Sequence, residues 1–598
     1  MSTPQTRTSI VWDYAPAPES PDHVRLRDSY GLFIDGDFQA PSDGTRVATI
    51  NPATEEPVAE VAFAGPGDVR RAVESARRAQ PGWAALSGLE RGKYLFRIAR
   101  LIQERARELA VVESMDGGKP VRESRDVDVP LAAAHFFHYA GWADKLAYGV
   151  GGREVAPLGV AAQIVPWNFP LLMAAWKLAP ALACGNTAVL KPAETTPLTA
   201  LLLAEVLQEA ELPPGVVAIV PGDGAAGATL VREPDIDKVA FTGSTGVGKD
   251  IQAALAGRGV SLTLELGGKS ANIVFEDAAL DQAVEGIVNG IFFNQGHVCC
   301  AGSRLLIQES VADTVIAKLW ERMGRLRVGD PLDKNTDVGA INSREQLDRI
   351  RSLVSAGEEE GAERRSVACE LPERGWWFAP TLFTGVAPAH RIAVEEIFGP
   401  VVSVLTFRTQ AEAIEKANNS TYGLAAGIWT DKGAKAFEVA SALQAGVVWQ
   451  NTYNHFDPTA AFGGYKESGF GREGGPSGLR PFLRVSCAGC RYRRPTSSTW
   501  AARSCARSPG ATTATATATS RAPRARTCAT PSRRRAPRPG RGPPAPPTTA
   551  GRSSTAPRRR SSPAPPTSRS SGRRSRLRST CSCTTPAGPT SWRRSSAA

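Results

Sequence analysis

Two adjacent cysteines, Cys299 and Cys300, lie in residues 292–302 (FFNQGHVCCAG) of a chain that has 10 cysteines among 598 residues. A thiolate attacks carbonyl carbon readily, but it depends on a base or an oxyanion donor that the rest of the fold must supply. The two thiols fit an inert buried pair equally well, because free cysteine is among the most buried residue types. The segment therefore suggests covalent catalysis by a cysteine and leaves open which sulfur, if either, reacts.

A carboxylate and an amide elsewhere in the chain have the chemistry that such a cysteine needs. Glu265 lies in the apolar run 262–266, before two glycines (LELGGK). Burial raises the pKa of a carboxyl group, which suits a general base, although a structural glutamate paired with a cation fits the same pattern. Asn168 stands between Trp167 and Phe169 (IVPWNFP), where its amide could stabilise an oxyanion or cap its own turn.

Residues 241–250 (FTGSTGVGKD) have the pattern of a strand that ends in a glycine-rich turn and opens a helix. The N-terminus of a helix binds phosphate through its backbone N–H groups. The string nearly matches the phosphate loop of nucleoside triphosphatases, but Asp250 stands where the magnesium-binding Ser or Thr belongs. The spacing also differs from the common dinucleotide fingerprint, so a plain tight turn remains an alternative.

The elements that must position these residues follow an alternating pattern. From Val160 onward short apolar runs (VAAQIV, TAVLK, VVAIV, KVAFTG, LTLELGG, ANIVF) alternate with helical patterns, which predicts a doubly wound parallel sheet. Upstream, residues 31–38 predict a hairpin, residues 68–79 an amphipathic helix and residues 91–109 a second long helix. A further α/β region is predicted over residues 266–461.

The charge of the chain is concentrated at one end. The net charge of +12 is typical of a nucleic-acid binder. The tail, residues 486–598, has 24 Arg and no Asp, Glu or Lys, so the body, residues 1–485, carries a net charge of −12. The body has four cysteines and no apolar signal segment at its start, which predicts a cytoplasmic protein. Its most apolar stretch, residues 169–190, is interrupted by Lys177, so no membrane span is predicted.

Seven motifs occur in a fixed order along the body, and together they carry a family resemblance. They are IVPWNFP, KPAETTP, FTGSTGVGK, LELGGKS, NQGHVCCAGSR, EEIFGPV and FGGYKESGFGRE. From residue 30 to residue 483 the chain resembles the aldehyde dehydrogenase superfamily. The resemblance implies an α/β aldehyde dehydrogenase-like fold, with a Rossmann-like parallel-sheet cofactor domain, an α/β catalytic domain and a small oligomerisation hairpin.

The resemblance implies a role for each candidate residue. Cys299 would be the nucleophile that attacks an aldehyde, with Cys300 a neighbour without an essential role. The Asn168 amide and the backbone N–H of Cys299 would hold the oxyanion, and hydride would pass to the nicotinamide. Water activated by Glu265 would then hydrolyse the thioester to a carboxylate, while Lys177 would assist proton movement or packing.

The resemblance also implies the residues that bind the cofactor, which is expected to be NAD rather than NADP. An acid at Glu194 favours NAD, because a carboxylate repels the 2′-phosphate of NADP. Ser244 would meet the pyrophosphate and Glu396 the nicotinamide ribose. The implied contacts are Ile164, Pro166, Trp167, Lys191, Glu194, Gly243, Ser244, Gly248, Glu396 and Phe398. No metal site is implied.

Domains and partners follow from the same resemblance. The predicted domains are an N-terminal arm (1–28), an NAD-binding domain (29–137 and 159–265), a catalytic domain (266–461), an oligomerisation segment (138–158 with 462–485) and the tail (486–598). The predicted partners are a small-molecule aldehyde and further copies of the chain, as a homodimer or homotetramer, with no nucleic acid and no membrane. The alternatives are a non-catalytic scaffold, a CoA-acylating enzyme, a nucleic-acid-binding tail and, for the base, a Cys299–His297 pair.

The tail has the composition of GC-rich coding DNA translated out of frame. Its codons permit a shifted frame in which residues 494–511 read TYKLYVGGAFVRSEPGR, similar to YGLFIDGDFQAPSDGTR at residues 30–46. Two later stretches conceal VRDAVAAARPAPG and YNRGQVLYR, in the same order as VRRAVESARRAQPG and LERGKYLFR in the body. We interpret the tail as the frameshifted start of a second such module. It is expected to be disordered, to bind no metal at residues 487–490 (CAGC) and to weaken assembly by altering the C-terminal strand.

Overall fold

The computed structural model describes residues 15–486. The predictions made for the tail, including its disorder and its lack of a metal site, therefore lie outside the described residues, as do the first 14 residues of the predicted N-terminal arm. Among the helices that the structure describes, none combines the length and the hydrophobicity that crossing a membrane requires.

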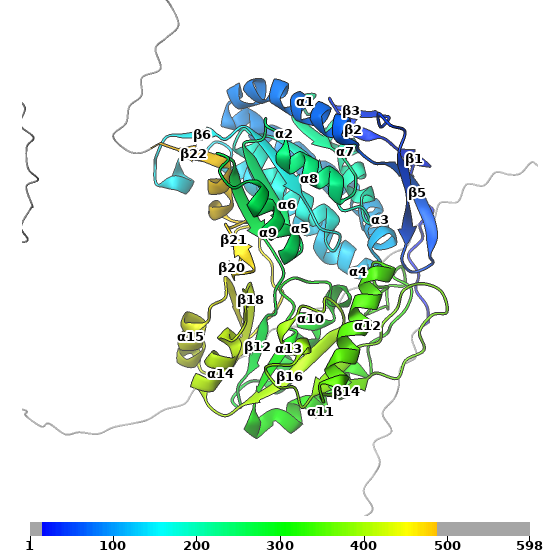
Figure 1. Ribbon diagram of the computed structural model, residues 1–598, viewed down its shortest axis with the longest axis vertical. Coiled ribbons are helices and arrows are strands. Elements are labelled where there is room, and N and C mark those ends of the chain that lie inside the picture. Colours follow the sequence, from blue (N-terminus) through cyan, green and yellow to red (C-terminus); the bar gives the residue numbers. More distant parts are fainter. Residues whose placement is uncertain (1–14, 487–598) are drawn as a thin grey trace, which may run out of the picture. The chain divides into compact units, whose positions relative to one another are not determined.

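The first large layer is an eight-stranded sheet with the strand order β21-β11-β10-β7-β8-β9-β2-β3. Figure 1 labels β2, β3 and β21 of this sheet. Its five central strands run parallel, which confirms the predicted doubly wound sheet. These strands are β7 (Val160–Ile164), β8 (Thr187–Lys191), β9 (Val217–Ile219), β10 (Lys238–Thr242) and β11 (Ser261–Glu265). The predicted hairpin is present as β2 (Leu32–Ile34) and β3 (Asp37–Gln39) at the edge of this sheet.

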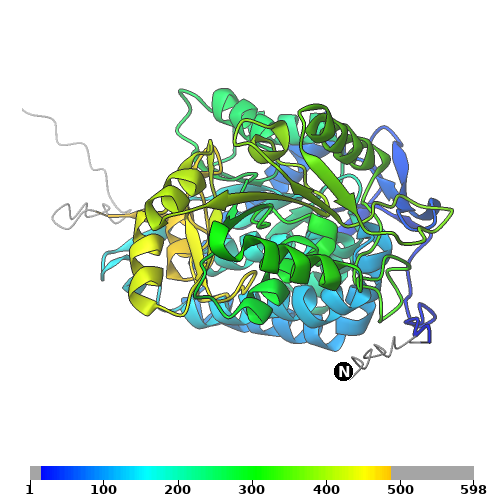
Figure 2. The same ribbon diagram turned by 90° about the horizontal axis from the view of Figure 1, so that it is seen from below.

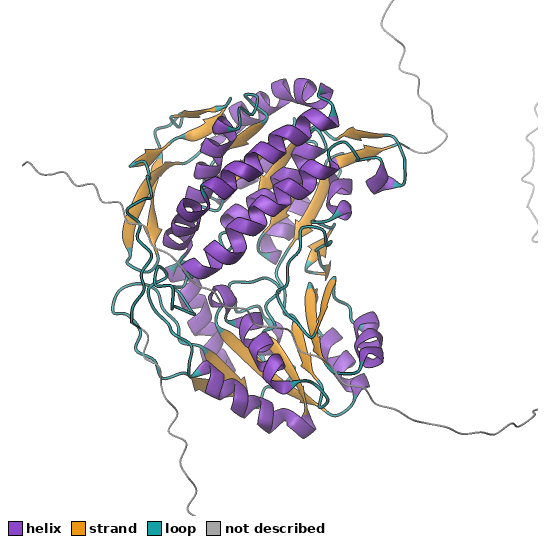
Figure 3. Ribbon diagram, turned by 180° about the vertical axis from the view of Figure 1, so that it is seen from behind, coloured by secondary structure: helices purple, strands orange, loops and turns teal. Residues whose placement is uncertain are grey.

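Helices cover both faces of this sheet, and successive strand residues alternate between two cores. Ala161 and Ala188 join a core with α2, α5, α6 and α7, whereas Val160 and Val189 join a core with α1, α8 and α9. In Figure 3 the long helices that cover one of these faces lie in front of the strands. A parallel strand buried on both faces is apolar throughout, which is why these strands appear in the sequence as continuous apolar runs. The helices are α1 (Pro66–Ala85), α2 (Gly88–Glu104), α5 (Val129–Trp142), α6 (Pro170–Ala183), α7 (Leu198–Glu209), α8 (Gly224–Arg232) and α9 (Thr245–Ala254).

One predicted helix is divided in two. The pattern over residues 91–109 predicts one helix, but α2 ends at Glu104 and α3 (Ala106–Gly117) begins after Arg105. Arg105 leaves the helical region (φ −95°, ψ 14°), and its guanidinium binds Glu108 and Glu205. No glycine or proline marks this break, so the periodicity continues through it in the sequence.

A seven-stranded sheet with the order β14-β15-β16-β13-β12-β18-β19 forms the second α/β region, as predicted for residues 266–461. Figure 2 shows helices on both of its faces. The strands are β12 (Ala271–Val274), β13 (Arg304–Gln308), β14 (Glu363–Ser366), β15 (Thr381–Thr384), β16 (Val401–Phe407), β18 (Ala425–Trp429) and β19 (Val447–Gln450). The helices are α10 (Leu280–Ile291), α11 (Ala312–Met323), α12 (Arg344–Glu359), α13 (Arg391–Val394), α14 (Gln410–Asn418) and α15 (Gly433–Ala442).

The segment 462–485 connects these two regions. Its first strand, β20 (Tyr465–Lys466), pairs with β17 (Tyr422–Gly423), and its second, β21 (Gly469–Phe470), pairs with β11. Its last strand, β22 (Leu483–Val485), pairs with β6 (Val155–Pro157). The expected hairpin over residues 138–158 is not formed, because residues 138–142 complete α5 and β6 finds its partner far along the chain. The domain boundaries themselves stay a prediction.

Two buried carboxylates on α3 support the helices that follow the strands of the site. The Glu113 carboxylate accepts a hydrogen bond from Leu171 N–H at the start of α6 and from the Thr199 hydroxyl in α7. Asp116 accepts from Leu198 N–H, the first residue of α7, at 2.9 Å. Neither helix has a side-chain cap of its own, so these acceptors satisfy amides that would otherwise be unpaired. Burial raises the pKa of Asp116 to about 8.

Candidate active site

A cavity of about 470 Å³ brings together residues from distant parts of the chain. Its walls include Cys299, Glu265 and Asn168, three of the four residues predicted to act in the chemistry, together with Glu396 and Phe398, whereas the fourth, Lys177, does not line it. The carboxyl ends of β7, β10 and β11 supply one side of it, and the loop after α10 supplies the other. The fold therefore brings Asn168 and Cys299, which are 131 residues apart in the sequence, into one cavity.

Cys299 follows a turn of unusual backbone conformation. Asn294, Gln295 and Gly296 all have positive φ (49°, 52° and 75°), a region that residues other than glycine rarely adopt. A Cβ atom at Gly296 would stand 2.1 Å from the carbonyl oxygen of Gly399, so glycine is required there. We call residues 294–296 the nucleophile turn.

The two sulfurs have different environments. Cys299 is half-buried, whereas Cys300 is fully buried and donates a weak hydrogen bond to Asn454 Oδ1. Burial raises the pKa of the Cys300 thiol well above its usual value. The more accessible sulfur is thus Cys299, and a thiol kept protonated by burial is a poor nucleophile.

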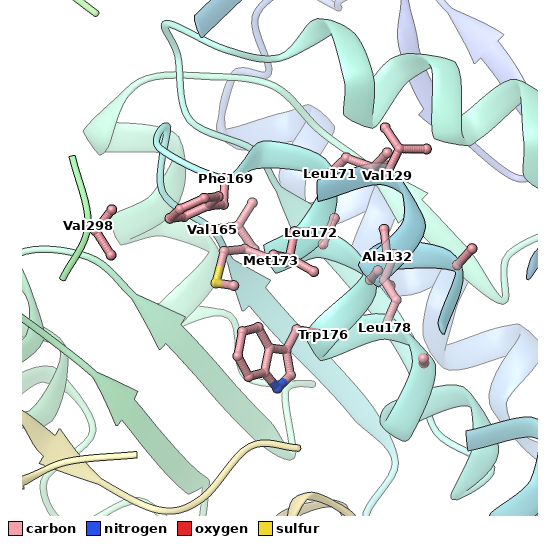
Figure 4. Packing of buried hydrophobic residues seen from close by; sticks show 14 of the residues in the cluster. Val129, Ala132, Val165, Phe169, Leu171, Leu172, Met173, Trp176, Leu178 and Val298 are labelled. Carbon is pink, nitrogen blue, oxygen red and sulfur yellow. The ribbon is translucent and has the colours of Figure 1, made fainter. Parts of the chain in front are cut away.

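Asn168 is clamped to the nucleophile turn. Its Nδ2 donates to the His297 carbonyl at 2.7 Å, and Asn294 Nδ2 donates to the Asn168 carbonyl at 2.8 Å. The amide therefore does not cap its own turn. An amide nitrogen carries two hydrogens, and the second one has no partner among the residues that the structure describes. Figure 4 shows Phe169 and Met173 on the side of the site that faces Val298, the residue before Cys299.

Glu265 ends β11 and is 4% exposed, and neither carboxylate oxygen has a hydrogen-bond partner in the described part of the chain. Burial, followed by the charge of Glu473, raises its pKa well above the usual value. Lys177, fully buried in α6, pairs with Glu473, and its charge acts in the opposite direction on Glu265. The predicted base therefore lies beside a buried ion pair.

Glycines let these groups approach each other. A Cβ at Gly268 would be 2.5 Å from the Cys299 carbonyl oxygen, and one at Gly267 would be 2.2 Å from Glu396 Oε2. Gly268 N–H donates to Glu396 Oε1 at 3.0 Å. The pair of glycines after Glu265 thus allows the nucleophile and Glu396 to lie against one backbone segment.

The predicted phosphate turn lies at the N-terminus of α9. Thr242, Gly243, Ser244, Thr245 and Gly246 line the cavity. Gly243 N–H donates to the Glu265 carbonyl at 3.1 Å, which ties this turn to the base. Ser244 caps α9 by accepting from Val247 N–H. Gly248 lies outside the cavity, and a Cβ there would be 2.5 Å from a Leu266 methyl group.

Aromatic side chains line the part of the cavity where the nicotinamide is predicted to bind. Trp167 and Phe398 meet edge to face with ring centroids 5.2 Å apart, and both line the cavity with Pro166. Phe398 has a positive φ of 57°, and its carbonyl accepts from Gln346 Nε2 at 2.9 Å. Burial raises the pKa of Glu396 to about 7.

Comparison with known proteins decides the family. A sequence model described as the aldehyde dehydrogenase family matches residues 38–487. This chain belongs to the aldehyde dehydrogenase family. It is 46% identical over 468 residues to human retinal dehydrogenase 2, covering 76% of this chain and 90% of that protein. It is 44% identical over 472 residues to an aldehyde dehydrogenase of Alternaria alternata, covering 77% and 95% respectively.

Solved structures agree with this assignment. The structure of a Bacillus cereus aldehyde dehydrogenase in complex with NAD+ has a TM-score of 0.75 and 41% sequence identity. The match covers 77% of this chain and 98% of that one. The chain is therefore an aldehyde dehydrogenase in sequence and in fold, and it oxidises aldehydes with a nicotinamide dinucleotide.

Besides Gly248, three predicted cofactor contacts of this aldehyde dehydrogenase lie beyond the cavity wall: Ile164, Lys191 and Glu194. Ile164 and Lys191 are paired at the carboxyl ends of β7 and β8, and Lys191 Nζ binds Glu194 Oε2 at 3.1 Å. They form a group at the ends of these strands rather than at the nucleophile. His297, the alternative base, packs against both Trp167 and Phe398, and burial lowers its pKa to about 3.

Sequence reasoning missed several residues of the site. Glu473 closes the motif FGGYKESGFGRE, but the motif by itself indicates no role for this acid. Gln346 and Arg349 of α12 hold the carbonyls of Phe398 and Glu396, and nothing in their helix distinguishes them from surface residues. Glu123 holds the nucleophile turn. In the sequence it is only an isolated acid in a helical pattern, which indicates no role.

Proposed function

We propose that this aldehyde dehydrogenase oxidises an uncharged, apolar aldehyde to its carboxylate through a covalent bond to Cys299, with NAD as the acceptor. The observation that carries the proposal is the meeting of three groups in one cavity. They are the half-buried Cys299 thiol, the second hydrogen of the Asn168 amide, and the two oxygens of Glu265, which accept no hydrogen bond from residues 15–486.

In the proposed sequence, the Cys299 thiolate adds to the aldehyde carbon and the carbonyl oxygen becomes an oxyanion. Asn168 Nδ2–H and the backbone N–H of Cys299 hold that oxygen. Loss of hydride from the tetrahedral carbon leaves a thioester, and NAD supplies the hydride acceptor when it is bound. Glu265 then takes a proton from water, the hydroxide oxygen bonds to the thioester carbon, and the Cys299 thiolate leaves. The positive charge of Lys177 stabilises the carboxylate form of Glu265, and the negative charge of Glu473 stabilises its protonated form.

The residues present fit a dinucleotide. The N-terminus of α9 offers backbone N–H groups for the pyrophosphate, with Ser244 and Gly243 in the cavity wall and space beside Gly246. The buried Thr242 hydroxyl has no hydrogen-bond partner among the described residues. Glu396 suits the nicotinamide ribose hydroxyls, since its Oε2 is not used by Gly268.

The preference for NAD over NADP rests on Glu194. Its carboxylate is half-exposed and already paired with Lys191, so the cation that would neutralise a 2′-phosphate is engaged by the acid that repels it. This arrangement supports NAD.

The proposal of an apolar substrate depends on the part of the cavity wall that is assigned neither to the chemistry nor to the cofactor. That wall is aromatic and aliphatic, and the charged groups within it, Asp128 and Glu473, are acids, whereas the one lining cation in the described residues, Arg349, lies on the side of Glu396, whose carbonyl it binds. An aldehyde with a carboxylate tail would be repelled and would leave its charge in a dry region. The names of two relatives, retinal dehydrogenase 2 and indole-3-acetaldehyde dehydrogenase, support an apolar body. The wall residues are Leu172, Met173, Trp176, Phe169, Phe293, Phe456 and Phe462.

A substrate panel tests the proposal. NADH formation is measured with aromatic, aliphatic and anionic aldehydes, each with and without coenzyme A. The expected result is turnover of neutral apolar aldehydes to the acid, unaffected by coenzyme A, because Glu265 activates water. A requirement for coenzyme A would favour the acylating alternative, and the lack of any turnover would favour the non-catalytic scaffold.

Assembly and compartment complete the proposal. We infer a homodimer or homotetramer, with the two-stranded sheet of β6 and β22 as part of the contact and with weaker association than in relatives because of the altered sequence after β22. The four cysteines of the described residues are all free, which supports the cytoplasm as the compartment. Light scattering on the purified chain measures the assembly.

A further inference from the structure

The nucleophile turn is a strained segment that its surroundings must hold. Asn294 and Gln295 are non-glycine residues with φ of 49° and 52°. This backbone conformation is unfavourable for a residue with a side chain, and it persists only where the surrounding structure determines it. Since only His297 and Val298 separate this turn from Cys299, the contacts that hold the turn also set the direction of the sulfur.

The side chains of the turn are anchored at two places. Gln295 donates to the Ala340 carbonyl at 3.1 Å and accepts from Gly339 N–H at 3.2 Å. Asn294 Nδ2 binds the carbonyl of Asn168. These contacts fix side chains, and within the turn itself the Asn294 carbonyl accepts from His297 N–H at 2.8 Å, which leaves the Asn294 N–H group to be held from outside the turn.

The carboxyl group of Glu123 holds that backbone. Its Oε2 accepts from Asn294 N–H at 2.8 Å, and the side chain is buried, with 6% of the residue exposed. Asn294 is the first residue of the nucleophile turn with positive φ, so the contact is made where the chain enters the strained conformation. Without an acceptor, this buried N–H group would be desolvated with no hydrogen bond in compensation, which destabilises the conformation of the turn.

Glu123 is also rigidly connected to the opposite wall of the cavity. It ends the short helix α4 (Val121–Glu123), which continues through a π-helical turn, η1 (Ser124–Asp128), into α5. Val127 and Asp128 of that turn line the cavity. A π-helical turn within a longer helix is a rare conformation that frequently occurs at functional sites. The same turn of helix therefore shapes the substrate wall and holds the nucleophile turn.

The environment of Glu123 favours a neutral acceptor. Burial raises the pKa of its carboxyl group to about 8, with Asn294 N–H and Arg122 acting against that rise and Asp128 adding to it. Lys119, which pairs with Glu113 and Asp128, is the other cation acting on it. Because the carboxyl group needs only an oxygen to accept the Asn294 N–H, glutamine should replace it and an apolar residue should not.

We propose that Glu123 is a positioning residue for the nucleophile, acting through the Asn294 N–H group to keep the nucleophile turn, and with it Cys299 and Asn168, in reactive geometry. The inference rests on the proposed role of Cys299. It assigns Glu123 no contact with aldehyde or cofactor.

The test compares Glu123→Ala, Glu123→Met and Glu123→Gln with a matched control, Asp116→Ala. Asp116 is also a buried acid that accepts one backbone N–H, but at the start of α7 and not in the nucleophile turn. Each protein is measured for the rate of Cys299 alkylation by iodoacetamide, mapped by peptide mass spectrometry, for kcat and KM with one aldehyde, for NAD binding and for Tm. Glu123→Met keeps the volume of the side chain and serves where the alanine variant folds poorly.

We expect substitution of Glu123 to impair the positioning of the nucleophile and substitution of Asp116 to reduce stability alone. Glu123→Ala and Glu123→Met should lower both the alkylation rate and kcat by about 10- to 100-fold, the effect of a small misplacement of a reacting group. Their Kd for NAD should stay unchanged. Glu123→Gln should recover both rates to near the wild type, and Asp116→Ala should lower Tm without changing the alkylation rate.

Three outcomes would overturn the inference. Wild-type alkylation and kcat in Glu123→Met would leave Glu123 with a structural role only. Loss of activity in Glu123→Gln equal to that in Glu123→Met would show that the proton or charge matters and not the hydrogen bond. Equal loss in Asp116→Ala would show general destabilisation. The alkylation measurement does not need turnover, so a wild-type protein that oxidises no aldehyde would refute the proposed function separately.

Discussion

Replacing Lys177 with methionine should raise the pKa of Glu265 and slow hydrolysis of the thioester. Lys177 and Glu473 form an ion pair in which the lysine side chain is fully buried and the glutamate side chain 8% exposed. The charge of Lys177 lowers the pKa of Glu265 and that of Glu473 raises it. Methionine removes only the favourable charge, so two carboxylates would remain in the same dry region.

The expected size of the effect follows from this geometry. A charge a few ångströms from a carboxyl group moves its pKa by about 1–3 pH units. Water activation requires the carboxylate form of Glu265, so kcat rises as pH rises through this pKa. On the acidic side of the profile, a pKa that is higher by one pH unit lowers kcat about tenfold. The unpaired Glu473 should also destabilise the protein by about 3–5 kcal/mol.

The assay is the pH profile of kcat for Lys177→Met, Glu473→Gln and the double variant, with thermal unfolding of each. Lys177→Met should move the midpoint to higher pH and Glu473→Gln to lower pH, while the double variant should return both midpoint and stability toward the wild type. A midpoint that stays in place or falls in Lys177→Met, or a double variant no better than the single one, would refute the coupling of this pair to Glu265.

Three further changes test other parts of the site. Glu265→Gln should slow hydrolysis more than acylation, so a burst of NADH should appear in stopped-flow traces; loss of the burst together with turnover would place Glu265 in an earlier step. Asn168→Ala should lower kcat/KM by about 100- to 1000-fold without changing the Kd for NAD, and an effect below about tenfold would exclude the amide as an oxyanion donor. Glu194→Ser should raise the activity with NADP relative to NAD, and a wild-type enzyme that already prefers NADP would contradict the role given to Glu194.

The fold and the central residues were predictable where local pattern and family motif agree. β7, β8, β10 and β11 appear as apolar runs because both of their faces are buried, and the polar residues at their carboxyl ends mark the site. The double glycine after Glu265 is explained by the two close approaches that a Cβ would block. In these segments the sequence shows both the reactive residue type and the strand end at which the residue lies.

The remaining residues depend on tertiary contacts that have no local signature. Glu473 becomes part of the site because β21 joins the sheet beside β11 and brings the following residues against Lys177, 296 residues away. Glu123 in a short helix has the pattern of a surface acid, and only the packing of that helix against the nucleophile turn buries it. For the same reason the predictions of one continuous helix over residues 91–109 and of a hairpin within residues 138–158 were wrong, because ion pairs and long-range strand pairing decide these segments and the residue pattern does not.

The central claim, that Cys299 carries the acyl group, is tested most directly by locating that group. Glu265→Gln enzyme is mixed with NAD and a neutral apolar aldehyde, quenched in acid within the burst, digested and sequenced by mass spectrometry. The acyl mass should lie on Cys299, should be absent from the Cys299→Ala form of the same enzyme and should persist in the Cys300→Ala form. An acyl group on Cys300, or a burst of NADH with no acylated cysteine at all, would contradict the account.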